Sequence, residues 1–210
     1  MKKVRWGVLG AGGIAERRTL PGMMQAENAE LIAVMEVNAE NAERLRAKFG
    51  AKRAYTSDEA LLKDPEIDAV YIASPVILHA RQAKLAADCG KHILLEKPLA
   101  LTAAEAQEVV SYCESKGVKI AAGFMMRYGA YVQAMKQAIA QGKIGQLVSC
   151  SALLTCWYPD MPGAWRQQKK NSGGGSLMDM GVHCIDLIQY VTGSRVRQVA
   201  AMHDTQTFSY

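Results

Sequence analysis

The first 122 residues alternate short apolar runs with longer amphipathic stretches, and this alternation constrains the fold more than any other feature of the chain. The clearest strand-like runs are Val4–Leu9, Leu31–Glu36, Ala69–Ala73, His92–Glu96 and Val118–Ala122. Helical periodicity falls between them, over Gly13–Ala26, Ala39–Phe49, Ile77–Cys89 and Thr102–Lys116. Strands that alternate with helices form βαβ units and a parallel sheet. The sequence therefore predicts an α/β domain over residues 1–122, built on a doubly wound parallel sheet.

The pattern changes after residue 122. The predicted order is a helix over about 130–141, a strand over 146–155, an irregular stretch over 156–175, a helix over 176–191 and a strand-like segment over 195–208. Helices separated from strands are typical of an α+β unit. Two strands alone form only a marginally stable ribbon in water. We therefore expect residues 123–210 to form a second, incomplete α+β domain.

Charge and hydropathy exclude several classes of protein. Half of the residues are hydrophobic and 21% are charged, which excludes a disordered or low-complexity chain. The formal net charge is +5 and the basic residues occur as scattered pairs, so nucleic acid is not an expected partner. The longest apolar stretches are strand-sized, so neither a membrane span nor an export signal is expected. The five cysteines lack C-x-x-C and zinc-site spacings, which predicts reduced thiols, no metal site and a cytoplasmic location.

A glycine-rich turn follows the first predicted strand. Its sequence is Gly10-Ala11-Gly12-Gly13-Ile14-Ala15, a G-x-G-x-x-A pattern. Gly10 permits a tight turn, Gly12 lets the backbone approach a pyrophosphate, and the small Ala15 lets the following helix pack on the strand. The same string can mark a tight turn without a ligand, but its position between a strand and a helix favours a Rossmann-type dinucleotide site. The candidate cofactor-binding residues here are Gly10, Gly12, Gly13 and Ile14.

Glu36 ends the second predicted strand, 21 residues after Ala15. A carboxylate at this distance can accept hydrogen bonds from both ribose hydroxyls of an adenosine. Taken alone it is equally compatible with a solvated acid at the start of a loop, and the glycine-rich turn favours the ribose role. Neither Val37 nor Asn38 is a cation that can bind a 2′-phosphate, and Glu36 would repel one. The sequence thus predicts NAD as the cofactor in preference to NADP.

Two further motifs follow predicted strands. Ser74-Pro75 comes after the strand that ends at Ala73, and Lys97-Pro98 comes after the strand that ends at Glu96. Open α/β sheets bind their ligands at the carboxyl ends of the strands. A lysine in a loop is often only solvated, but its place on this edge makes Lys97 a candidate site residue.

The most informative segment is the predicted helix Ser176–Tyr190. Apolar residues occur nearly all round it, so we expect it to be buried. The polar residues that form one stripe along it, spaced 4, 3 and 4 apart, are Asp179, His183, Asp186 and Tyr190. Part of the stripe has a structural explanation, since Ser176 and Asp179 match a capping box and Asp186 could brace a core histidine. Asp179 and His183 still bring a carboxylate within one turn of an imidazole, a pair suited to proton transfer.

Taken in order, these motifs resemble those of the Gfo/Idh/MocA family of nicotinamide-dependent oxidoreductases. The resemblance covers the whole chain. It is carried by the G-x-G-x-x-A turn, by Ser74-Pro75 with His79, by G-K-H-x-x-x-E-K-P over Gly90–Pro98, by Trp165-Arg166, and by G-G-G-x-x-x-D-x-G-x-H-x-x-D over Gly173–Asp186. One departure is Val76, where the family often has Asn.

The resemblance implies an NAD(P)-dependent dehydrogenase or reductase that acts on the CH-OH group of a sugar, a polyol or a related hydroxy or keto compound. It implies that Lys97, Asp179 and His183 are the catalytic trio. The further cofactor-binding residues that it implies are Ser74, Pro75, His79, Glu96, Lys97, Trp165 and Arg166. The family's second domain, which serves substrate binding and oligomerisation, is a large open-faced sheet that continues beyond a position like Tyr210. The resemblance thus implies that residues 123–210 are an incomplete α+β open-sheet domain. We therefore expect a truncated member that forms homo-oligomers through this sheet.

Two other interpretations stay open at this point. One is a catalytically impaired fragment that acts only as a nucleotide-binding protein, which a missing part of the sheet favours and the intact Lys97, Asp179 and His183 oppose. The other is a structural oligomerisation protein, which leaves the polar stripe of the helix unexplained. The identity of the substrate is not encoded in any single residue of the chain.

Overall fold

The computed structural model describes residues 2–204, without the side chain of Lys169. The chain divides into two compact units, of which the first ends at Gly123 and the second begins at Phe124. Among the described residues, none of the helices is both long enough and apolar enough to cross a membrane.

The first unit is built on one sheet of six parallel strands, in the order β3-β2-β1-β4-β5-β6. The strands are β1 Val4–Leu9, β2 Ala29–Met35, β3 Arg53–Tyr55, β4 Ala69–Ile72, β5 His92–Leu95 and β6 Ile120–Ala122. The chain runs outward from β1 to one edge, returns to the centre at β4 and runs to the other edge. The predicted doubly wound, Rossmann-type fold is therefore confirmed. Strand β3 is absent from the clearest predictions because three half-buried residues carry no periodicity.

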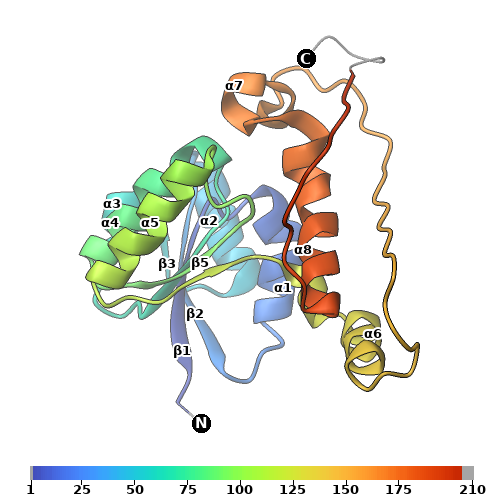
Figure 1. Cartoon of the computed structure of the whole chain (residues 1–210). Coiled ribbons are helices and arrows are strands. Elements are labelled where there is room, and N and C mark those ends of the chain that lie inside the picture. Colours follow the sequence, from blue (N-terminus) through green and yellow to red (C-terminus); the bar gives the residue numbers. More distant parts are fainter. Residues whose placement is uncertain (1, 205–210) are drawn as a thin grey trace. The chain divides into compact units, whose positions relative to one another are not determined.

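Helices cover both faces of this sheet (Figure 1). They are α1 Leu20–Met23, α2 Ala39–Phe49, α3 Asp58–Leu62, α4 His79–Asp88 and α5 Ala103–Ser115. One apolar cluster joins α3, α4 and α5 through the fully buried Leu61, Ala83 and Val109. The other joins α1 and α2 through Leu20 and Leu45. Successive side chains of a strand point to opposite faces, so both clusters are anchored on the same strands.

The helix predicted over Gly13–Ala26 is shorter and less regular than expected. A π-helical turn spans Ala15–Thr19, and α1 continues it only to Met23. Pro21 has no N–H with which to continue the backbone ladder, and Gly22 has a low helix propensity. The sequence of this segment therefore favours a short, locally widened helix.

The second unit contains helices and extended chain. Its α-helices are α6 Ala130–Ala140, α7 Lys169–Ser172 and α8 Val182–Thr192, with a π-helical turn over Leu177–Gly181 directly before α8. The strands predicted over 146–155 and over the described part of 195–208 are wrong, since neither segment is assigned as strand; residues 205–208 lie outside the described chain. A strand exists only when a neighbour pairs with its backbone, and the described residues of these segments have no such neighbour.

The helix predicted to be buried is only partly so. Leu177 is 60% exposed and Ile185 is 45% exposed, whereas His183 and Asp186 are buried. Two residues of the polar stripe, His183 and Asp186, are therefore enclosed together with the apolar Val191, whereas Asp179 and Tyr190 are only partly buried. A buried polar group is costly unless it is hydrogen-bonded, so His183 and Asp186 must find partners.

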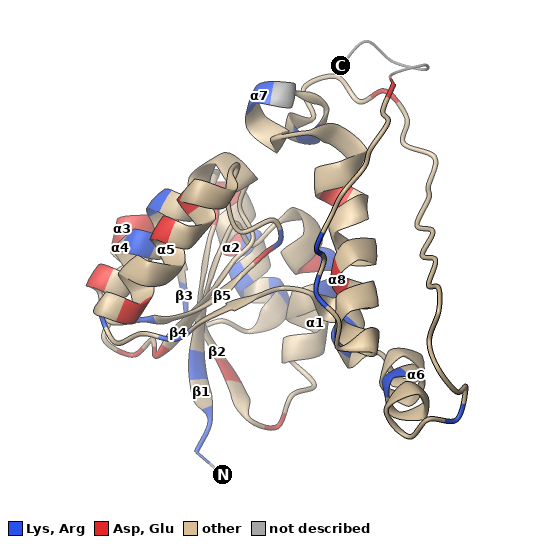
Figure 2. Cartoon of the chain, viewed as in Figure 1, with Lys and Arg blue, Asp and Glu red and all other residues tan. Residues whose placement is uncertain are grey.

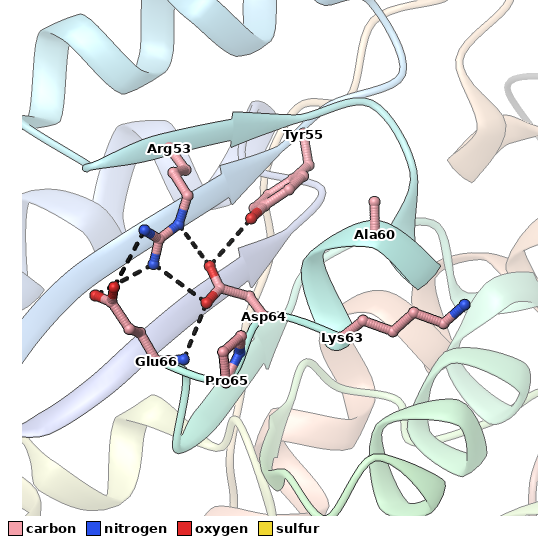
Figure 3. Close-up of a pocket in the computed structure, with 7 residues that line it drawn as sticks. All are labelled: Arg53, Tyr55, Ala60, Lys63, Asp64, Pro65 and Glu66. Atoms are coloured by element: carbon pink, nitrogen blue, oxygen red, sulfur yellow. Dashed lines mark hydrogen bonds and ion pairs between the residues drawn. The ribbon is translucent and has the colours of Figure 1, made fainter.

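A buried carboxylate fastens the loop between α3 and β4 to strand β3. Asp64 accepts from Arg53 Nε at 2.6 Å, from Tyr55 Oη at 3.1 Å and from the backbone N–H of Glu66 at 2.9 Å. Figure 3 shows these groups around a surface hollow of about 350 Å³. Burial alone raises the pKa of Asp64, but these hydrogen bonds together hold that pKa below its ordinary value.

We predict that Asp64→Asn lowers the free energy of unfolding by about 2–4 kcal/mol at neutral pH, because Arg53 then loses its buried carboxylate. The native carboxyl has a depressed pKa, so its contribution is complete above an unfolded pKa of about 3.9 and is lost as the pH falls through the native value. Urea unfolding at neutral and at acid pH checks this. The difference between the two proteins should shrink in acid, and the exposed Glu27→Gln serves as the control.

Candidate functional site

The turn after β1 lies directly against the turn after β4. The register pairs Leu9 with Ile72, so both strands end at the same level. Gly10 has φ +70°, and a Cβ there would lie 2.7 Å from the backbone nitrogen of Ser74. The position therefore requires glycine both for its conformation and for its space. This is the point at which the strand order reverses, where open α/β sheets bind their ligands.

Glu36 reaches across the glycine-rich turn. The backbone N–H of Gly12 donates to Glu36 Oε1 at 2.6 Å, and a Cβ at Gly12 would lie 2.9 Å from the same oxygen. Gly13 has φ +56° and no atom within 4 Å of the position of its absent Cβ. The turn thus has backbone without side chains at Gly12 and Gly13, next to the carboxylate of Glu36, which lies 24 residues from Gly12 in the sequence. This combination fits the pyrophosphate and the adenosine ribose of a dinucleotide.

His79 connects the loops that follow β4 and β5. Its ring nitrogens lie 2.9 Å from the carbonyl oxygen of Ser74 and 2.8 Å from that of Pro98. The ring is fully buried, and burial lowers its pKa although both carbonyls favour a protonated ring. The hydroxyl of Ser74 in turn donates to Gln82 of α4. Because both ring nitrogens are bound to loop carbonyls, His79 would affect a nucleotide only indirectly, by holding these two loops in position.

Glu96 is held by a hydrogen-bonded chain that starts in the first helical segment. Thr19 Oγ1 donates to Tyr71 Oη at 3.0 Å, and that hydroxyl donates to Glu96 Oε1 at 2.5 Å. The second carboxylate oxygen accepts from the backbone N–H of Lys97 at 3.1 Å. Burial, together with the neighbouring Glu96, raises the pKa of Tyr71, so its hydroxyl stays a donor. Sequence reasoning missed Thr19 and Tyr71, because Tyr71 lies in a strand in which every residue is buried.

In the second unit, Asp186 pairs with Arg127. Arg127 Nε donates to Asp186 Oδ2 at 2.9 Å, and a second guanidinium nitrogen contacts the other carboxylate oxygen. The guanidinium lies 5.6 Å from the ring centre of Phe124 and 5.2 Å from that of Tyr190. The ring of Phe124 also meets the imidazole of His183 edge to face, with 6.2 Å between centroids. Arg127 was not predicted, since it belongs to no recognised spacing.

Asp179 and His183 lie on neighbouring turns, as predicted, but the backbone between them is π-helical over Leu177–Gly181. Such turns often occur at functional sites. Arg166 stacks on the ring of Trp165 at 4.4 Å, and its Nε lies 3.7 Å from Asp179 Oδ1. The capping-box interpretation of Ser176 is wrong, since its side chain makes no capping hydrogen bond. Asp179 thus has a cationic neighbour within its own unit.

Charges of both signs lie along α3, α4 and α5 (Figure 2). Several form ion pairs between these helices, including Arg81 with Asp58 and Lys84 Nζ with Glu108 Oε1 at 2.6 Å. These pairs neutralise basic side chains on this face of the sheet. The face therefore presents mixed charge to solvent.

Two family models match the chain. One, described as an oxidoreductase family with an NAD-binding Rossmann fold (GFO_IDH_MocA), matches residues 4–124. The other, described as a GFO/IDH/MocA C-terminal domain, matches residues 132–209.

Similar proteins include named sugar oxidoreductases. The 1,5-anhydro-D-fructose reductase of Ensifer adhaerens is 33% identical over 198 residues, or 94% of this chain and 59% of the relative. The D-xylose 1-dehydrogenase (NADP(+)) 2 of Haloferax volcanii is 34% identical over 201 residues, or 96% and 61%. The solved structure of levoglucosan dehydrogenase in complex with NADH and levoglucosan has a TM-score of 0.78 and 32% identity, covering 91% of this chain and 55% of that one. The chain thus spans about 60% of the length of these two curated relatives.

We expect Asp186→Asn to lower the free energy of unfolding of the second unit by about 1–3 kcal/mol, because it leaves the Arg127 guanidinium without its carboxylate. Urea unfolding in a Trp6→Phe background, followed by the fluorescence of Trp157 and Trp165, measures this. The exposed Asp160→Asn is the control. Additive effects of Asp186→Asn and Arg127→Met in the double variant would show that the two side chains are not coupled.

Proposed function

The chain belongs to the Gfo/Idh/MocA family of oxidoreductases, and from this we propose that it is an NAD(P)-dependent dehydrogenase or reductase acting on a hydroxyl or keto group of a sugar, a polyol or a related compound. The observation that carries the proposal is the carboxylate of Glu36 on the backbone N–H of Gly12, beside the point where the strand order reverses. The named activities of relatives, on anhydrofructose and on xylose, support the substrate class.

We propose NAD as the preferred cofactor. Gly10, Gly12, Gly13 and Ile14 would face its pyrophosphate, and Glu36 would accept from the ribose hydroxyls. When bound, the nicotinamide supplies the hydride acceptor or donor. The levoglucosan dehydrogenase structure, which contains NADH, supports this preference. Because the similar D-xylose 1-dehydrogenase is named for NADP(+), the affinities of this chain for NADH and NADPH must be compared.

The cofactor contacts proposed beyond the glycine-rich turn are Ser74, Pro75, His79, Glu96, Lys97, Trp165 and Arg166. In the oxidative direction His183 accepts the hydroxyl proton of the substrate. Asp179 orients and stabilises the resulting imidazolium, and Lys97 polarises the reacting oxygen. The backbone N–H of Lys97 donates to the Glu96 carboxylate, and this hydrogen bond fixes the backbone position from which the lysine side chain extends.

A homo-oligomer formed through the second domain is part of this proposal. Val148 and Leu153 lie in the extended segment that was predicted as a strand, and both are almost fully exposed. Pairing with a second copy would cover such side chains and satisfy the extended backbone. Light scattering on the purified chain tests this. A cytoplasmic location likewise stays a prediction, from the cysteine content.

Replacing Glu36 with Ala should weaken NADH binding by roughly 1–3 kcal/mol, because charge-assisted hydrogen bonds to the ribose are lost. Titration of NADH fluorescence measures the change. Glu40→Ala, four residues away on the exposed side of α2, is the matched control. Tighter binding of NADPH than of NADH by the unmodified protein would contradict the preference for NAD.

His183→Ala and Lys97→Ala should each lower turnover by about 10²-fold or more while NADH affinity changes little, because both groups act in the transition state. Asp179→Asn should have an intermediate effect. Oxidative turnover should fall as the pH drops below neutrality, because a protonated imidazole cannot accept the proton.

These rates come from the change in NADH absorbance with a panel of polyols, aldoses and keto-sugars. The exposed His203→Ala serves as the control. Full turnover by His183→Ala with every accepted substrate would remove His183 from the mechanism. Nucleotide binding without turnover on any substrate would favour the interpretation as a nucleotide-binding protein.

A further inference from the structure

A second charged cluster lies beside Glu36, between the first helical segment and α2. Glu16 accepts from Arg44 Nη1 at 2.7 Å, from Arg44 Nη2 at 2.9 Å and from Lys48 Nζ at 2.8 Å. Hydrogen bonds from Arg44 and Lys48 lower the pKa of Glu16 to about 2. The carboxylate is therefore ionised over the whole physiological range, and it holds two cations.

Arg44 is connected to the glycine-rich turn through one side chain. Its Nε and Nη2 donate to Asn41 Oδ1 at 3.0 Å and 2.6 Å. Asn41 Nδ2 lies 3.7 Å from the position that a Cβ of Gly12 would occupy, and Glu36 Oε1 lies 2.9 Å from the same point. Arg44 also interacts electrostatically with Glu36. Only the side chain of Asn41 thus lies between the guanidinium of Arg44 and the turn beside the proposed ribose site.

This cation bears on the choice between NAD and NADP. The two nucleotides differ by a 2′-phosphate on the adenosine ribose, and an arginine near the ribose is the usual means of accepting that phosphate. Val37 and Asn38, which directly follow Glu36, have no cationic side chain. Arg44 is hydrogen-bonded to Asn41, which lies against the glycine-rich turn, whereas Lys48 lies one helical turn further from it along α2. Arg44 is therefore the cation of this cluster best placed to meet a 2′-phosphate.

We propose that Arg44 is a specificity-determining residue of the dinucleotide site and that Glu16, by binding its guanidinium, competes with a 2′-phosphate for it. The inference rests on the proposed function, since it assumes that the turn binds a nicotinamide dinucleotide. The preference for an unphosphorylated ribose then has two sources. Glu36 repels the phosphate, and Glu16 occupies the arginine that would otherwise bind it.

The test is the ratio of NADPH affinity to NADH affinity, measured by fluorescence titration. Glu16→Gln keeps the shape of the side chain but removes its charge, and it should raise this ratio about tenfold or more. A gain of that size corresponds to one charge-assisted hydrogen bond to the phosphate. Adding Arg44→Met to Glu16→Gln should abolish the gain, because the phosphate then has no guanidinium to bind.

The same helix supplies a matched control. Arg46 donates to Glu43 through Nε at 2.8 Å, in an exposed pair of the same kind on α2. Glu43→Gln releases an arginine two positions from Arg44 and should leave the ratio unchanged. Thermal melting of each variant checks that the fold is kept.

Three results would overturn the inference. One is an unchanged ratio in Glu16→Gln, and another is a gain that persists in Glu16→Gln with Arg44→Met. The third is a gain that Lys48→Met, and not Arg44→Met, abolishes. If the unmodified protein binds neither NADH nor NADPH, the proposed function itself fails. If it binds NADH and only the ratio fails to respond, the proposed function stands and the role of Arg44 is rejected.

Discussion

The close approach of two backbone turns organises the first unit. Gly10 lies so near Ser74 that no side chain fits between them, and β1 and β4 end level at this point. The N–H groups of Gly10 and Ala11 both donate to the carbonyl oxygen of Met35 at 3.1 Å, which ties the turn to β2 as well. Because three central strands meet here through backbone contacts, the glycine-rich turn has a defined position without any ligand.

Side chains from the core support the loops around this turn. Tyr71 and His79 are almost completely buried, yet each places its polar atoms at the edge of the sheet. Tyr71 links Thr19 to Glu96, and His79 links the loop of Ser74 to that of Pro98. A buried polar group is costly unless it is hydrogen-bonded, so these side chains keep the loops in place. Such support is what a preorganised binding site needs.

The second unit uses buried charge in a different way. The enclosed side of α8 carries His183 and Asp186, and Asp186 is neutralised by Arg127 between two aromatic rings. Phe124 contacts both the guanidinium and the ring of His183. The ion pair and the imidazole therefore share one aromatic neighbour. A change in the pair would therefore reach His183 through the packing of Phe124.

The sequence by itself determined the doubly wound sheet and the glycine-rich turn, because periodicity and glycine conformations are local properties of the chain. It predicted a ribose role for Glu36, whereas the hydrogen bond that Glu36 accepts from Gly12, 24 residues away, was decided by the tertiary structure. It did not determine which buried polar groups pair: the partners Tyr71 and Glu96, Arg44 and Glu16, and Arg127 and Asp186 lie 25, 28 and 59 residues apart. These pairs form only where packing brings distant backbones together. For the same reason the strand predicted over 146–155 is not formed, since a sequence pattern is local whereas a strand requires a hydrogen-bonded neighbour that only the tertiary structure supplies.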